Sequence, residues 1–129
     1  MNNIKQVIII RKDLNMRRGK EISSGSHASN HILVDAFFER LDSKQIILTE
    51  EWLRSGYRKI TLQCESEDKL KAVHELAKSK GLSSYLVEDL GYTEFHGVPT
   101  LTACAIGPDY SDLIDEITGP NGLLPLKLY

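Results

Sequence analysis

The sequence predicts an α/β domain of three layers, in which a mixed four-stranded sheet is flanked by helices on both faces. Short apolar runs that suit strands alternate with longer segments whose apolar residues recur at helical spacing. Glycine and proline separate these segments, as at Gly81, Pro108 and Gly119. The 129 residues, of which 41% are hydrophobic and 26% charged, suit one globular domain over residues 1–129.

The first part of the chain predicts one strand and two helices. A β-branched apolar run between polar flanks predicts a buried strand over residues 4–10. A helix of about twenty residues is expected after Gly19, since its apolar positions recur at helical spacing. The first half of this helix is small and polar, which allows a backbone or a ligand to approach closely. Residues 46–55 predict a second short helix with Trp52 and Leu53 on its apolar face.

The middle of the chain predicts a strand followed by a well-delimited helix. Apolar and polar side chains alternate over residues 59–64, as in a half-buried strand. Ser66 then suits the N-cap of a helix with one apolar stripe, and Gly81 suits its end.

The last part of the chain predicts two strands and a helix. The strands are expected over residues 84–87 and 101–106, and their short connection permits antiparallel pairing, so we expect a mixed sheet. Pro108 is expected to end the second of these strands. Asp109 or Ser111 is expected to cap the final helix.

Composition excludes several classes of protein. No apolar run approaches the roughly 20 residues of a membrane span, so no membrane partner is expected. The N-terminal residues lack a signal-peptide pattern, which predicts a cytoplasmic protein. Cys64 and Cys104 fall in predicted strands without a CxxC pair, so we expect two buried, reduced thiols.

The net charge of −2 argues against a protein that coats nucleic acid, but the charges are unevenly distributed. Residues 1–20 contain one acidic residue, Asp13, and a group of basic residues: Lys5, Arg11, Lys12, Arg17, Arg18 and Lys20. Such a segment is either a solvated turn or a local patch that binds a phosphate backbone.

Lys20 is expected at the start of the long helix, where a cation opposes the helix dipole. This placement indicates either an anionic ligand or a solvated helix end. Gly19-Lys20 is not a P-loop, because that motif requires glycine at position 14 and serine or threonine at position 21. The chain has Leu14 and Glu21 there, and no nucleotide cofactor is expected.

His27 and His31 are four residues apart on one helix face, with Asp35 four further on. This spacing is conceivable for a metal pair, but no third ligand is implied, and we expect no metal. A half-buried, hydrogen-bonded His27 fits the pattern better.

Asp89 follows an apolar strand and precedes Gly91. A carboxylate here either caps a turn or acts as a general base that orients water. Thr93 and Thr102 flank the loop over residues 94–100, and each is either structural or positions a water or carbonyl group.

Taken together, the segments resemble the class II (archaeal/eukaryotic-type) peptidyl-tRNA hydrolases over nearly the whole chain. The similar segments are Asp13-Leu14, Met16, Gly19-Lys20, Ser26-His27-Ala28, Trp52, Gly56, Lys59-Ile60, Asp89, Gly91, Thr93, Thr102, Ile106-Gly107-Pro108, Asp112-Leu113-Ile114-Asp115 and Ile117-Thr118-Gly119. The resemblance implies a mixed four-stranded sheet and hydrolysis of the ester between peptide and tRNA, without a cofactor or metal. It is compatible with a homodimer.

The resemblance also implies a site. Its catalytic residues correspond to Lys20, Asp89 and Thr102, with His27 and Thr93 nearby. The tRNA-facing residues would be Arg11, Lys12, Arg17 and Arg18.

The chain departs from the family pattern in three places. Ser24 stands near the site where the family usually has glutamine, the loop over residues 94–100 is one residue longer, and the tail after Gly119 is extended. Serine cannot match the reach or the donor and acceptor of a glutamine amide. Two alternatives therefore stay open: a catalytically inactive tRNA- or protein-binding module, and a hydrolase of another acyl ester or amide.

Overall fold

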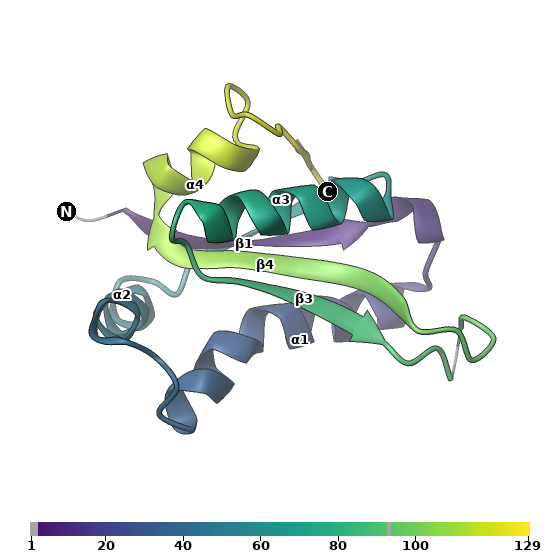
Figure 1. Cartoon of the computed structure of the whole chain (residues 1–129), viewed down its shortest axis with the longest axis horizontal. Coiled ribbons are helices and arrows are strands. Elements are labelled where there is room, and N and C mark those ends of the chain that lie inside the picture. Colours follow the sequence, from purple (N-terminus) through teal and green to yellow (C-terminus); the bar gives the residue numbers. More distant parts are fainter. Residues whose placement is uncertain (1–2, 93) are drawn as a thin grey trace.

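The computed structural model describes residues 3–92 and 94–129. Over these residues the chain forms a five-stranded sheet with helices on its two faces (Figure 1). The elements are β1 (Ile4–Arg11), the short 3₁₀ helix η1 (Lys12–Leu14), α1 (Arg18–Phe37), α2 (Ser43–Arg54), β2 (Lys59–Cys64), α3 (Glu67–Ser79), β3 (Ser84–Asp89), β4 (Thr100–Tyr110), α4 (Ser111–Thr118) and β5 (Lys127–Leu128).

The sheet is mixed, as expected, but the predicted number of four strands was wrong. Its order is β3-β4-β1-β2-β5, in which β1 and β2 are parallel and β4 is antiparallel to both β1 and β3. The fifth strand consists of two residues, Lys127 and Leu128, which pair with Gln63 and Leu62 of β2. Two residues show no measurable alternation, and their pairing depends on the backbone of an edge strand rather than on side-chain pattern.

The core lies on both sides of β1. Figure 1 shows α3 and α4 on one face of the sheet and α1 and α2 on the other. Val7 and Ile9 point into the larger apolar cluster under α3 and α4, whereas Ile8 and Ile10 point into the cluster under α1. Because β1 has neighbours on both edges and helices on both faces, all eight of its residues are buried.

Pro108 does not end β4, contrary to the prediction. The strand continues to Tyr110, and Pro108 lies in a bulge: Gly107 and Pro108 together occupy the space opposite Gln6. A proline in a bulge removes no ladder hydrogen bond, because the extra residue is unpaired.

The predicted helix caps were right in one case and wrong in another. Ser66 accepts a hydrogen bond from the Lys69 amide and caps α3, as expected. The residue before α4 is Tyr110, without a side-chain cap, so the prediction of Asp109 or Ser111 was wrong. Asp109 instead accepts from the Tyr110 amide within the strand end.

In α2, Trp52 is fully buried, but Leu53 is 45% exposed, so only the first belongs to the apolar face. The two cysteines are both buried and unpaired, and burial raises the pKa of Cys104 to about 12. Among the described residues, none of the helices is long and apolar enough to span a bilayer.

The topology gathers several chain ends at one edge of the sheet. Strands β1, β2 and β3 all run in the same direction, because β1 and β3 are each antiparallel to β4. Their carboxyl ends therefore meet at one edge, where α1 begins and β4 starts (Figure 1). Open α/β sheets bind their ligands at this edge.

Candidate active site

The centre of the candidate site is an ion pair between residues 69 positions apart in sequence. The Lys20 Nζ, in the first turn of α1, lies 2.8 Å from Oδ2 of Asp89 at the end of β3. The two side chains are only 17% and 18% exposed. The structure thus brings together two of the three residues that the family resemblance implies as catalytic.

The turn after β3 fixes the Asp89 carboxylate. Its second oxygen, Oδ1, accepts a hydrogen bond from the Gly91 amide at 2.7 Å. Gly91 has a φ of +86°, and a Cβ there would lie 2.4 Å from the Val98 carbonyl oxygen, so only glycine fits. Asp89 therefore caps a turn and also faces Lys20: the two readings of this residue are compatible.

The pKa of Asp89 lies below its ordinary value. The main cause is the hydrogen bond from Lys20, followed by that from the Gly91 amide, and the positive charges of Lys20 and His27 act in the same direction. Asp89 is therefore ionised at neutral pH. With its pKa lowered in this way, the Asp89 carboxylate can orient a water molecule. It becomes basic enough to remove a proton when Lys20 shifts toward another anion, because the hydrogen bond that lowers its pKa is then lost.

Thr102 lies in a β-bulge that turns its side chain toward α1. Between the pairs Val87–Ala103 and Glu88–Leu101, Thr102 is the extra residue of β4. Bulges of this kind redirect a side chain next to active sites. The Thr102 hydroxyl donates a hydrogen bond of 3.1 Å to the Ser24 hydroxyl on α1, and both residues are buried.

His27 lies about one helical turn after Ser24 and about two turns after Lys20, on the same side of α1. Its side chain is exposed, so the expectation of a half-buried His27 was wrong. His31 stacks on Tyr85, with 3.5 Å between ring centroids, and its Nε2 is 3.3 Å from Asp35. The part of the chain that the structure describes contains no cluster of three metal-ligating side chains.

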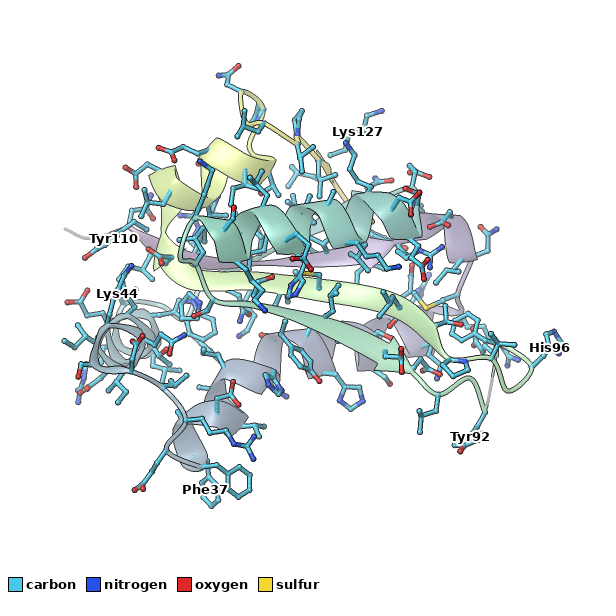
Figure 2. All side chains as sticks on the ribbon, in the orientation of Figure 1. Phe37, Lys44, Tyr92, His96, Tyr110 and Lys127 are labelled. Carbon is cyan, nitrogen blue, oxygen red and sulfur yellow. The ribbon has the colours of Figure 1, made fainter. Side chains whose placement is uncertain are left out.

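The loop between β3 and β4 borders the site. Thr93 lies outside the described residues. Figure 2 shows Tyr92 and His96 projecting from this loop beyond the end of the sheet. Glu94 ties the loop to the start of α1, because its carboxylate accepts from the Arg17 backbone amide and lies 3.3 Å from the Arg17 Nε.

The predicted tRNA-facing residues separate into two kinds. Arg11 is buried, and its guanidinium group donates to both oxygens of Asp13 and to the Leu101 carbonyl. Lys12, Arg17 and Arg18 are exposed near the beginning of α1.

Sequence reasoning missed Glu94, Tyr57 and Tyr129. Glu94 lacks any motif, and only the fold places it beside Arg17. Tyr129 belongs to the extended tail, whose departure from the family pattern was the available signal; its hydroxyl donates to both Glu21 oxygens, at 2.7 and 2.6 Å. Tyr57, with a φ of +56°, follows Gly56 in the turn before β2.

The chemistry available at the Lys20–Asp89 pair is polar and hydrolytic. A fixed carboxylate can orient a water, and an adjacent ammonium can stabilise an oxyanion with the N–H groups that Asp89 does not use. Such a pair suits attack of water on an acyl group.

Comparison with known proteins agrees with this chemistry. The family model described as "Peptidyl-tRNA hydrolase PTH2" matches residues 4–124. A peptidyl-tRNA hydrolase of Methanopyrus kandleri is 42% identical over 120 residues, which cover 93% of this chain and 97% of that protein. Proteins of the same name from Methanocaldococcus jannaschii (94% of this chain, 100% of that protein) and Pyrobaculum aerophilum (98% of each) are 38% and 36% identical. The chain belongs to the PTH2 family of peptidyl-tRNA hydrolases.

Proposed function

We propose that Lys20, Asp89 and Thr102 perform the reaction of this peptidyl-tRNA hydrolase, the cleavage of the ester between a peptide and the terminal ribose of tRNA. The observation that carries the proposal is the contact of 2.8 Å between Lys20 Nζ and Asp89 Oδ2, made at the edge where open sheets bind ligands. Both side chains of this pair are less than 20% exposed, whereas the buried Lys5 and Arg11 pair with carboxylates that are 50% and 30% exposed.

Asp89 orients the attacking water. As water adds to the ester carbonyl carbon, the carbonyl oxygen gains negative charge, and Lys20 donates a hydrogen bond to it. When the Lys20 ammonium group shifts its interaction from Asp89 to this oxyanion, the pKa of the Asp89 carboxylate rises. Asp89 then accepts a proton from the attacking water. The bond from the carbonyl carbon to the ribose oxygen then breaks, and the ribose oxygen takes up the proton from Asp89 and becomes a hydroxyl. The peptide acid releases its remaining proton to solvent and leaves as a carboxylate.

Thr102 acts as a positioning residue, buried where β4 meets α1. The Thr102 hydroxyl donates its hydrogen to Ser24, so its oxygen can act only as a hydrogen-bond acceptor for other groups. Ser24, at the position where the family usually has glutamine, is the hydrogen-bond partner of Thr102 in this chain. His27 lies on the exposed side, and its electrostatic interaction contributes to the lowered pKa of Asp89.

The exposed cations Lys12, Arg17 and Arg18 contact the tRNA backbone in this proposal. The guanidinium group of Arg11 is occupied by Asp13 and the Leu101 carbonyl, so Arg11 holds the end of β1 against β4 and has a structural role. The protein acts in the cytoplasm as one domain over residues 1–129, and a homodimer remains part of the proposal. The inactive binding module has no specific observation in its favour.

The test is release of peptide from N-blocked aminoacyl-tRNA or peptidyl-tRNA, with and without a chelator. We expect turnover that survives chelation and falls about 10²–10⁴-fold in Asp89→Asn, the range for lost acid–base catalysis. Asp68→Asn, an exposed carboxylate on α3 at the opposite face of the sheet, is the matched control and should retain full activity. Wild-type rates in Asp89→Asn would refute the proposed site.

A further inference from the structure

A groove of about 900 Å³ lies on the side of α1 away from the ion pair. Its floor is formed by Ile8 and Ile10 of β1 together with Gly25 of α1, and Tyr57 and Tyr129 line it from the other side. The groove extends over β2, because Lys59 and Thr61 also line it. The mechanism uses none of these residues.

The helix separates the groove from the catalytic residues. At 3.6 residues per turn, Lys20, Ser24 and His27 share one side of α1, while Arg18 and Ile22 share another. The second pair lines the groove. Two sites on opposite sides of one helix are separated by its diameter of about 10 Å, so a ligand longer than one nucleotide reaches both.

Gly25 brings α1 close to the sheet at the floor of the groove. A Cβ at this position would lie 3.6 Å from the side chains of both Ile8 and Ile10, so α1 already sits in contact distance of the sheet there. The small neighbours Ser26 and Ser29 keep the groove open beside the helix. Ile22, 63% exposed, adds apolar surface at its rim.

Each tyrosine of the groove carries a cation on its ring. The Lys12 Nζ is 4.6 Å from the centroid of Tyr129, and the Lys59 Nζ is 3.0 Å from that of Tyr57. Tyr129 is 48% exposed, and Lys12 lies over one face of its ring. The hydroxyl of Tyr129 is held by Glu21, so the ring has a fixed orientation.

The charge of the groove is positive. Arg18 and Lys59 line it, Lys12 adjoins it, and the carboxylate of Glu21 opposes them with both oxygens engaged by Tyr129. Exposed aromatic faces beside cations are the combination with which proteins bind unpaired nucleotides, since bases stack on rings and phosphates meet the charges.

We propose that this groove binds unpaired nucleotides at the single-stranded, peptide-bearing end of the substrate tRNA, with a base stacked on Tyr129 and phosphates near Arg18 and Lys59. This inference rests on the proposed function for the identity of the RNA. A peptide is the less suitable occupant, because it carries no regular negative charge to match Arg18, Lys59 and Lys12, and no regular succession of planar groups.

The first experiment measures binding of a short single-stranded RNA that ends in CCA, by fluorescence anisotropy of a labelled oligonucleotide. We expect Tyr129→Ala to weaken binding about tenfold and Tyr129→Trp to retain it, because the ring rather than the hydroxyl stacks. Lys59→Gln should weaken binding and reduce the dependence of affinity on salt. Phe37→Ala is the matched control: Phe37 is 80% exposed at the far end of α1 (Figure 2).

The second experiment separates this inference from the proposed function. In steady-state hydrolysis, Tyr129→Ala should raise KM with little change in kcat, whereas Asp89→Asn lowers kcat. If Tyr129→Ala hydrolyses the substrate normally, with unchanged KM and unchanged affinity for the oligonucleotide, the groove does not bind the RNA. The proposed catalytic site is unaffected by that result. If the wild-type protein does not hydrolyse peptidyl-tRNA but its RNA binding still depends on Tyr129, the proposed function is wrong and the RNA-binding groove is retained.

A third outcome concerns the occupant. If an N-acetylated peptide competes with the oligonucleotide, and Tyr129→Ala weakens the peptide equally, then the groove binds the peptide portion and the RNA assignment is wrong. We expect no competition by such a peptide at concentrations that leave the RNA saturating.

Discussion

Asp89 combines two features that are often regarded as alternatives: it caps a turn, and it accepts a hydrogen bond from Lys20, the lysine proposed to be catalytic. One oxygen accepts from the Gly91 amide and the other from Lys20. The turn fixes the direction in which the carboxylate faces the lysine, and so the structural role supplies the geometry for the chemical one.

The lowered pKa of Asp89 has a consequence for stability. Because the folded-state pKa lies below the unfolded value, the ion pair stabilises the protein above the ordinary carboxyl range and at neutral pH, where the lysine carries its charge. That contribution is lost as the pH falls through the lowered pKa. Lys20→Met should therefore raise the pKa of Asp89 and reduce the free energy of unfolding at pH 7 by about 1–2 kcal/mol.

The measurement is urea unfolding of both proteins at pH 7 and again below the lowered pKa, with the Asp89 carboxyl followed by NMR. The difference in stability should disappear at the acidic pH. A difference that persists there would show that packing of the lysine stem, not its charge, is responsible.

Thr102 provides a second prediction at the scale of a residue. Thr102→Val keeps the shape but removes the hydroxyl that donates to Ser24, so we expect a fall in kcat of about tenfold or more, with KM nearly unchanged. Thr102→Ser restores the hydroxyl and should recover most of the rate. Steady-state kinetics of both variants check this; equal defects in valine and serine variants would favour a packing role.

At the scale of an element, the turn after β3 is the part of the site that tolerates least change. Gly91→Ala would place a methyl group against the Val98 carbonyl and force an L residue to a φ of +86°. We expect a loss of stability of more than about 1 kcal/mol and a fall in kcat, because the amide that holds Asp89 moves. Thermal unfolding and kinetics of this variant, beside Gly97→Ala, test this prediction. Gly97 also has a positive φ, but a Cβ at that position would meet no atom within 4 Å.

The elements also show where sequence reasoning succeeds. The strand over residues 59–64 and the Ser66-capped helix follow from alternation and a local cap, both of which depend on nearby residues. The end of β4 and the existence of β5 depend on pairing with distant backbone: Pro108 is accommodated only because Gln6 lies opposite a bulge, and Lys127 pairs only because β2 offers a free edge.

The candidate site divides in the same way. Lys20 and Asp89 were placed by resemblance and lie in contact, whereas the bulge that redirects Thr102 and the pairing of Glu94 with Arg17 need the fold. Arg11 looks like its basic neighbours in sequence, but its position as the last residue of the central strand buries it.

At the scale of the whole molecule, the net charge of −2 coexists with local basic surface at the start of α1 and beside the groove. Binding of tRNA should therefore weaken steeply with salt, since each phosphate contact releases a counterion. The triple variant Lys12→Gln, Arg17→Gln and Arg18→Gln should lower the slope of log affinity against log salt by about 2–3. Affinity measured from 50 to 300 mM salt checks this; an unchanged slope would place the tRNA on another surface.

Lys20 and Asp89 are proposed to act as one catalytic unit, and a double-mutant cycle under single-turnover conditions tests this coupling. The rate of peptide release is measured for the wild type, Lys20→Met, Asp89→Asn and the double variant. We predict that each single variant loses most of the rate and that the double variant is little slower than either, as for residues that act together. Losses that multiply, or single variants with wild-type rates, would contradict the claim.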